Sequence, residues 1–156
     1  MIKLMTSTFS KEELNSWAIL DVHHYFAWGG SSGCTNGCSY KCSDSSTEEG
    51  MNKINDIVVS EASSSHAWLI TQSDVPQIAC SEYSLATFCN SNDACRSKNI
   101  LKLMYDSQHE GFENQGLVAA FFWTWKMPYG GSHEASWSFK HYLGLDNGVN
   151  SIGVEK

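Results

Sequence analysis

Acidic, imidazole and phenolic side chains alternate along residues 20–28, which read Leu-Asp-Val-His-His-Tyr-Phe-Ala-Trp. Successive side chains of a strand point to opposite faces, so we expect Asp21, His23 and Tyr25 to share one face. We expect a functional role for His23, because Tyr25 and Asp21 lie beside it on this face. His24 falls on the opposite, apolar face, where a core histidine with a backbone partner is the simpler interpretation.

Two further side chains with chemical potential follow apolar runs. Glu82 comes directly after Ile78-Ala79-Cys80-Ser81, and a carboxylate in that place is costly to desolvate unless a site requires it. The alternative is that Glu82 caps the next segment or lies on the surface. Trp123 ends the run Phe121-Phe122-Trp123, where its ring could stack on a sugar or belong to the core.

The elements that must position these groups alternate along the chain. Ser10 with Glu13 three residues later is a capping pattern that predicts a short helix. Apolar residues at helical spacing predict helices over 47–63, with Ser46 or Thr47 as cap, and over 97–110, and a last helix is expected over 134–143. Apolar runs predict strands over 2–9, 17–26, 75–81 and 117–125, the last of them fully buried.

Strands that alternate with helices are typical of parallel βαβ units. Four such units make half of a (β/α)₈ barrel, whose usual length is about 250 residues. We therefore predict an α/β fold that corresponds to the second half, strands five to eight, of a (β/α)₈ TIM barrel. One domain is expected over residues 1–144, followed by a C-terminal tail over 145–156.

Composition excludes two classes of protein. Ten Lys and Arg against seventeen Asp and Glu give a net charge of −7, without the basic stripe of a nucleic-acid binder. No apolar run approaches the roughly 20 residues that cross a bilayer. The first residues, Met-Ile-Lys-Leu-Met-Thr-Ser, lack the apolar stretch of a signal peptide. We expect neither nucleic acid nor membrane as a partner.

Six cysteines in 156 residues favour a disulfide framework. Cys34, Cys38 and Cys42 lie in a loop rich in Gly and Ser, whereas Cys89 and Cys95 bracket a short polar segment. Fifteen pairings are possible, and we prefer Cys89–Cys95 for its short loop. A zinc site at the three spaced cysteines near His23 is the alternative, although zinc sites usually add a second pair further on.

Several motifs together resemble glycoside hydrolase family 5. They are LDVHHYFAW at 20–28, SEYSLAT at 81–87, FFWTWKMPYGG at 121–131 and HEASWSFKHYLG at 133–144. The chain is most similar to the secreted exo-β-1,3-glucanases (glucan 1,3-β-glucosidases) of fungi and fungus-like microbes. The resemblance covers residues 2–144 and makes residues 2–9 similar to barrel strand five.

The resemblance also implies roles for individual residues. Glu82 matches the strand-seven catalytic nucleophile, and His23 and Tyr25 match the His-x-Tyr pair that lines the subsite of the cleaved sugar. Trp123 matches the tryptophan on which that sugar stacks. The family's usual Gly-Glu-Trp-Ser reads Ser81-Glu82-Tyr83-Ser84 here, so both neighbours of the carboxylate differ.

A retaining glycosidase needs a second carboxylate as acid/base, about 5 to 5.5 Å from the nucleophile. The family carries it in an Asn-Glu-Pro-like motif on strand four, and this sequence contains no Asn-Glu dipeptide. We therefore expect the acid/base to lie upstream of this chain, and the chain alone to be inactive on glucan.

The resemblance implies a β-glucan partner, no cofactor and no metal. It also implies a monomeric parent enzyme that is extracellular or in the cell wall. The alternative is a glucan-binding remnant that retains Trp28, Trp123 and Trp125 and does not cleave.

Overall fold

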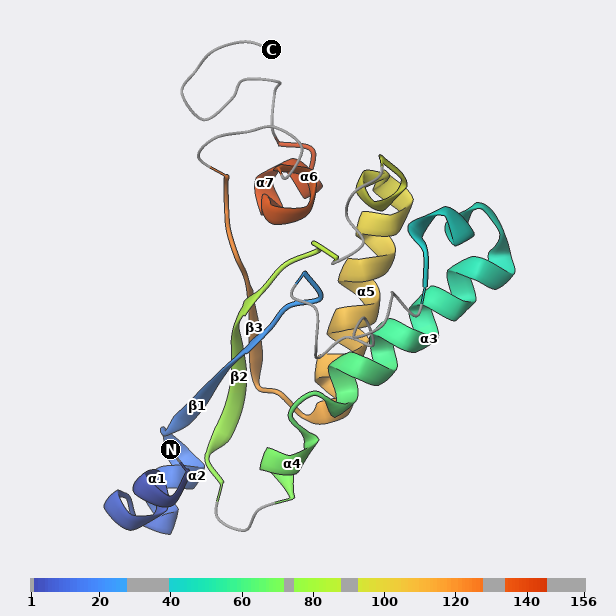
Figure 1. The fold of residues 1–156 in the computed structure, drawn as a ribbon. Coiled ribbons are helices and arrows are strands. Elements are labelled where there is room, and N and C mark those ends of the chain that lie inside the picture. Colours follow the sequence, from blue (N-terminus) through green and yellow to red (C-terminus); the bar gives the residue numbers. More distant parts are fainter. Residues whose placement is uncertain (1, 28–39, 72–74, 88–92, 128–133, 146–156) are drawn as a thin grey trace.

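The computed structural model describes residues 2–27, 40–71, 75–87, 93–127 and 134–145. Three parallel strands, β1 (Ile19–His24), β2 (Gln77–Tyr83) and β3 (Ala119–Phe122), form a sheet in the order β1-β2-β3. Two long helices, α3 (Glu48–Ser64) and α5 (Lys98–Gln115), follow β1 and β2 and lie on one side of it (Figure 1). The predicted α/β class, with parallel strands joined through helices, is confirmed.

Side-chain caps fix where three helices begin. Ser10 and Glu13 form the predicted capping box before α2 (Lys11–Ser16), since each side chain bonds the other's backbone N–H. The Thr47 hydroxyl accepts a hydrogen bond from the N–H of Gly50 at the start of α3, and Ser97 caps α5 in the same way. Two of these caps were predicted, and the third lies at the first residue of the predicted helix.

Helices α3 and α5 cross closely, with the core between them and the sheet. Ile54, Val58 and Ala62 of α3 and Met104 of α5 are almost completely buried. A Cβ at Gly111 of α5 would lie 2.4 Å from the Ala62 Cβ. The two helices can therefore approach this closely only because position 111 lacks a side chain.

The predicted strand over residues 2–9 is wrong, because Ile2–Thr8 forms helix α1. A helix satisfies its backbone groups internally, whereas a strand needs a neighbour in a sheet. The Ser7 and Thr8 hydroxyls both donate to the Leu4 carbonyl, which adds local hydrogen bonds to the helical form. Phe9 then packs edge-to-face on Trp17, with ring centroids 5.2 Å apart.

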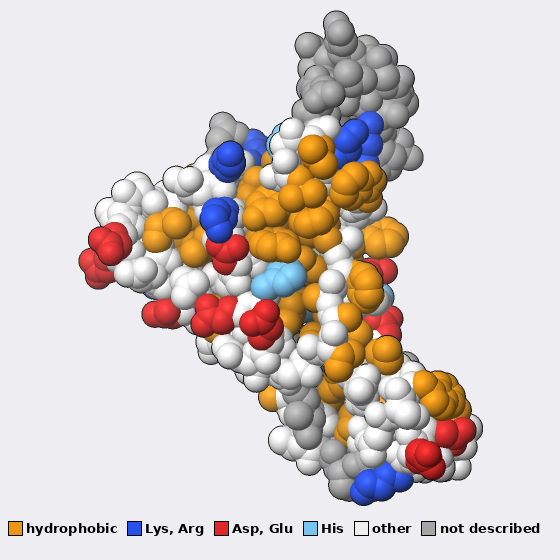
Figure 2. Space-filling model, turned by 180° about the vertical axis from the view of Figure 1, so that it is seen from behind, with side chains coloured by type: hydrophobic (Ala, Val, Ile, Leu, Met, Phe, Trp, Pro, Cys, Tyr) orange, Lys and Arg blue, Asp and Glu red, His pale blue; other side chains and the backbone are white. Residues whose placement is uncertain are grey.

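The predicted fully buried strand over 117–125 is also corrected. Regular pairing covers only Ala119–Phe122, and Phe121 is 60% exposed. Within the described residues the sheet ends at β3, so the outer edge of this strand has no pairing partner. Seen from behind, the molecule presents a broad group of hydrophobic side chains with charged side chains around it (Figure 2).

The helix predicted over 134–143 is two short helices, α6 (Glu134–Trp137) and α7 (Phe139–Tyr142). Ser138 separates them in an extended conformation, and its hydroxyl accepts from the N–H of His141. Helix α7 is attached by aromatic contacts, since Tyr105 of α5 stacks on Tyr142 and β3's Phe122 stacks on Phe139.

A disulfide joins the two loops that precede α3 and α5. Cys42 begins the 3₁₀ helix η1 (Cys42–Ser46), Cys95 lies in η2 (Asp93–Arg96), and their sulfurs are bonded. The predicted Cys89–Cys95 pair is therefore wrong. Folding packs η1 against η2, and this places Cys42, 53 positions earlier in the chain, next to Cys95. Cys34, Cys38 and Cys89 lie outside the described residues, while Cys80 is a buried free thiol.

No helix in the described parts of the chain is both long and apolar enough to cross a bilayer. Helix α4 (Ala67–Ile70), a short turn after α3, was not predicted.

Candidate functional site

The predicted site residues lie where the strands end. Parallel strands place their carboxyl ends at one edge of a sheet, and β1 and β2 bring His23 and Glu82 opposite each other in register there. The pairing is irregular just before this point, since Val22 pairs with Cys80 and Ser81 is passed over. Because of this bulge, the side chain of Glu82 lies on the same face of the sheet as that of His23.

Glu82 lies within hydrogen-bonding distance of the side chains of His23, in β1, and Tyr25, which directly follows β1. The Tyr25 hydroxyl donates to Glu82 Oε2 over 2.7 Å. Nδ1 of His23 lies 3.3 Å from the same oxygen. The side chain of Glu82 is 29% exposed, so a ligand from solvent can still reach the carboxylate. Three of the four predicted site residues are therefore in direct contact.

Tyr25 acts as a hydrogen-bond donor here. Burial raises its pKa above the ordinary value of 10, and the hydrogen bond to Glu82 and the negative charge of that carboxylate raise it further. The phenol therefore keeps its proton at neutral pH. The indole of Trp137 packs on the Tyr25 ring, with centroids 5.4 Å apart and planes inclined by 33°.

Asp21 contacts His23 on the side away from Glu82. Its Oδ2 lies 3.3 Å from His23 Nε2, and its Oδ1 accepts a 3.2 Å hydrogen bond from the N–H of Ser81. Hydrogen bonding from the Ser81 side chain is the largest cause that lowers the pKa of Asp21, and the positive charge of His23 lowers it further. Asp21, His23 and Glu82 thus form a continuous polar row.

Trp123 follows β3 at the same edge of the sheet. The backbone N–H of Trp123 donates to the Tyr83 carbonyl over 2.7 Å, and the residue is 50% exposed. The Trp123–Thr124 peptide bond is cis. The next residue, Thr124, donates from its N–H to the Trp137 carbonyl. Trp137 therefore joins the end of β3 to Tyr25, a role that we did not predict, although its motif was identified.

Two side chains near the site, those of His24 and Tyr83, face the helices. His24 is 3% exposed and packs between Phe26 and Phe112, so its core position is confirmed. Its Nε2 has no hydrogen-bond partner among the described residues, so the predicted backbone partner is not found at this nitrogen. Burial lowers its pKa to about 4. Tyr83, which differs from the motif of the resembled family, is buried against Phe112, and its hydroxyl oxygen lies 2.7 Å from His109 Nε2. Tyr83 therefore belongs to the core between β2 and α5.

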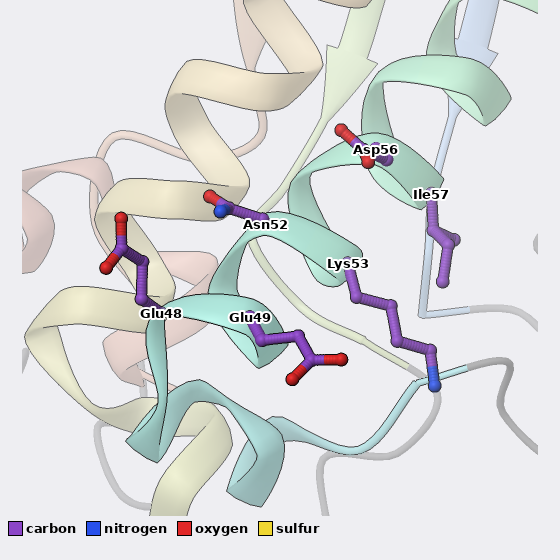
Figure 3. Close-up of a pocket in the computed structure, with 6 residues that line it drawn as sticks. All are labelled: Glu48, Glu49, Asn52, Lys53, Asp56 and Ile57. Atoms are coloured by element: carbon purple, nitrogen blue, oxygen red, sulfur yellow. The ribbon is translucent and has the colours of Figure 1, made fainter.

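A surface hollow lies elsewhere, on α3 (Figure 3). It includes none of the predicted site residues and is lined by Glu48, Glu49, Asn52, Lys53, Asp56 and Ile57. Within the described residues, no group of three His, Cys, Asp or Glu side chains could hold a metal ion. Cys42, one member of the alternative zinc site, is bonded to Cys95. Trp28 lies outside the described part of the chain.

Neither a protein-family model nor a curated protein matches this chain. Its function must therefore be inferred from its own residues. The arrangement at the sheet edge offers a half-buried carboxylate with a phenol donor on one oxygen, an imidazole beside it and an exposed indole nearby. These groups are suited to nucleophilic attack by the carboxylate on a bound ring, and equally to holding a polar ligand.

Proposed function

We propose that this chain carries the nucleophile side of a retaining glycosidase active site of the glycoside hydrolase family 5, glucan 1,3-β-glucosidase type. The observation that carries the proposal is the 2.7 Å hydrogen bond from the Tyr25 hydroxyl to Glu82 Oε2. It fixes one oxygen of the carboxylate at the carboxyl edge of a parallel sheet, where enzymes with parallel barrels carry their chemistry.

In the proposed reaction, the free oxygen of Glu82 attacks the anomeric carbon of a β-glucoside as the glycosidic bond breaks. A carboxylic acid from outside this sequence protonates the departing oxygen. The same group then takes a proton from water, which attacks the glycosyl ester and releases Glu82 with net retention of configuration. His23 lines the subsite of this sugar, and the exposed ring of Trp123 stacks on the apolar face of the sugar.

The proposed parent fold is a (β/α)₈ barrel, of which residues 1–144 supply the C-terminal half. Parallel strands with long helices on one side support it. The exposed side chains of Ile19 and Phe121, 52% and 60% accessible, also support it, because a closed barrel would bury one face of every strand. Since α1 replaces the expected strand five, the proposal relies on strands β1 to β3.

We propose a β-glucan as the substrate, without a cofactor, and an extracellular or cell-wall location for a monomeric parent enzyme. The Cys42–Cys95 disulfide supports the location, because disulfides persist in oxidising compartments.

A second candidate is glucan binding without cleavage. The exposure of Trp123 and Trp125, 50% and 56%, favours it, because two accessible indoles at one strand end can hold a sugar without any acid. A test must therefore separate binding from bond cleavage.

A substrate with a leaving group that needs no acid provides this test. With 2,4-dinitrophenyl β-glucoside, the proposal predicts a burst of dinitrophenolate of about one equivalent per chain, followed by slow turnover. Glu82→Gln should remove the burst, whereas Glu110→Gln on the outer surface of α5 should retain it. Binding of laminari-oligosaccharides without any burst would favour the second candidate.

A further inference from the structure

The bulge before Glu82 leaves one backbone group to be satisfied. Val22 pairs with Cys80 and His23 pairs with Glu82, so Ser81 is the extra residue of β2. An extra residue in a bulge lacks its regular ladder partner. The N–H of Ser81 instead donates to Oδ1 of Asp21 over 3.2 Å. The side chain of Asp21 therefore replaces the backbone acceptor that the N–H of Ser81 lacks in the bulge, directly before Glu82.

The second oxygen of Asp21 is linked to Glu82 through the ring of His23. Oδ2 lies 3.3 Å from Nε2 of His23, and Nδ1 of the same ring lies 3.3 Å from Glu82 Oε2. The orientation of the imidazole is therefore set between two carboxylates. Asp21 therefore contacts Ser81, which precedes Glu82 in β2. It also contacts His23, whose ring extends from β1 to Glu82.

We propose that Asp21 is a positioning residue for Glu82, and that it acts by holding the Ser81 bulge with one oxygen and the Nε2–H of His23 with the other. The catalytic consequence rests on the proposed function. The positioning itself concerns only the described residues and can be tested without activity.

The chemistry of the two contacts requires a carboxylate. The N–H of Ser81 donates to Asp21, and an ionised carboxylate only accepts, so the contact with His23 is favourable only when Nε2 carries a proton. The lowered pKa of Asp21 keeps it in this form at neutral pH. An asparagine could accept from Ser81 with its oxygen, but its amide nitrogen would then donate toward His23 Nε2. Nε2 would have to become an acceptor, and the ring proton would move to Nδ1, next to Glu82.

The simpler alternative is that Asp21 is one member of a surface ion pair. Its side chain is 54% exposed and that of His23 is 49% exposed, and such pairs contribute little to stability. A pair of this kind would not determine which imidazole nitrogen carries the proton. The proton position on His23 therefore distinguishes positioning from a surface contact.

Long-range ¹H–¹⁵N correlation spectra of the ¹⁵N-labelled full chain at pH 8 measure this proton position, with His23 assigned through His23→Gln. We expect Nε2 of His23 to carry a proton in the wild type, and Asp21→Asn to move the proton to Nδ1. Asp56→Asn, a matched change on the outer surface of α3, should leave the spectrum unchanged. The same spectrum in Asp21→Asn and wild type would overturn the proposal.

The wild-type spectrum keeps the proposal falsifiable if Asp21→Asn does not fold, because an unprotonated Nε2 in the wild type contradicts it directly. Amide exchange of Ser81 is the second measurement, and it should become at least tenfold faster in Asp21→Ala. Exchange at the wild-type rate would contradict the contact with the bulge.

The dinitrophenolate burst separates this inference from the proposed function. Asp21→Asn should slow the burst about tenfold, as expected for a lost charge-assisted hydrogen bond. If the proton moves as expected but the wild type shows no burst, the proposed function fails and the positioning stands. If the burst occurs and the proton does not move, the positioning fails alone.

Discussion

The Tyr25 hydroxyl donates a 2.7 Å hydrogen bond to Glu82 Oε2 across 57 positions of the chain. The contact depends on two features of the fold. Strands β1 and β2 are parallel neighbours, so their carboxyl ends meet at one edge. The Ser81 bulge then brings Glu82 opposite His23, two residues before Tyr25. One oxygen of the carboxylate is thereby occupied by protein groups, and the proposed chemistry uses the other.

Tyr25→Phe removes this donor with almost no change of shape. A hydrogen bond to a charged group contributes about 1.5 to 3 kcal/mol, so the rate of the dinitrophenolate burst should fall by about ten- to a hundredfold. Tyr142→Phe, which removes a phenol hydroxyl from α7, is the matched control and should retain the wild-type rate. An unchanged burst in Tyr25→Phe would show that the hydroxyl does not orient the nucleophile.

Glu61 on α3 should make stability depend on pH. Burial raises its pKa from 4.5 to about 7, and its Oε2 has no hydrogen-bond partner among the described residues. The unfolded chain therefore loses this proton at lower pH than the folded chain, and Glu61 lowers stability as pH rises from about 4.5 to 7.

Urea titrations of Glu61→Gln check this effect. The variant should unfold at nearly the wild-type midpoint at pH 4.5 and at a higher midpoint at pH 8. Glu110→Gln changes an exposed position of α5. Its urea midpoint should differ from that of the wild type by the same amount at pH 4.5 and at pH 8. A Glu61→Gln midpoint that follows the wild type at both pH values would contradict the buried carboxyl.

The Cys42–Cys95 disulfide should stabilise the fold through the loop that it closes. With 53 positions between the cysteines, the loop-closure relation gives roughly 4 kcal/mol. Cys42→Ala/Cys95→Ala should therefore unfold at a clearly lower urea midpoint than the oxidised chain. Peptide mapping without reduction should recover the Cys42 and Cys95 peptides joined, and recovery of Cys89 joined to Cys95 would contradict the structure.

The uncovered face of the sheet should make the isolated chain associate. Ile19 and Phe121 are more than half exposed on it, and both outer strands have unpaired edges within the described residues. Sedimentation velocity should show species larger than a monomer, and Ile19→Thr/Phe121→Ser should shift the distribution toward the monomer. A monodisperse wild-type monomer with concentration-independent unfolding would speak against an incomplete sheet.

Local patterns predicted much of this fold. Ser10 and Thr47 cap their helices because capping depends on residues three or four positions apart. The common face of Asp21, His23 and Tyr25 follows from strand alternation alone. Features set by distant contacts could not be predicted in this way.

Three features show this limit. The Cys42–Cys95 pair requires η1 to lie against η2, which no spacing of cysteines reveals. The Ser81 bulge is a mismatch between two strands and leaves no mark in either one. Residues 2–8 include apolar side chains that suit a strand or a helix, and this short pattern does not distinguish the two.

The most direct test of Glu82 as the nucleophile is to trap it. A 2,4-dinitrophenyl 2-deoxy-2-fluoro-β-glucoside needs no acid to depart, and its fluorine slows release of the glycosyl ester. After incubation and proteolysis, mass spectrometry should find one fluoroglucosyl group per chain on the peptide that contains Glu82, and none in Glu82→Gln. Label on another carboxylate, or an unlabelled chain that still binds glucan, would contradict the account.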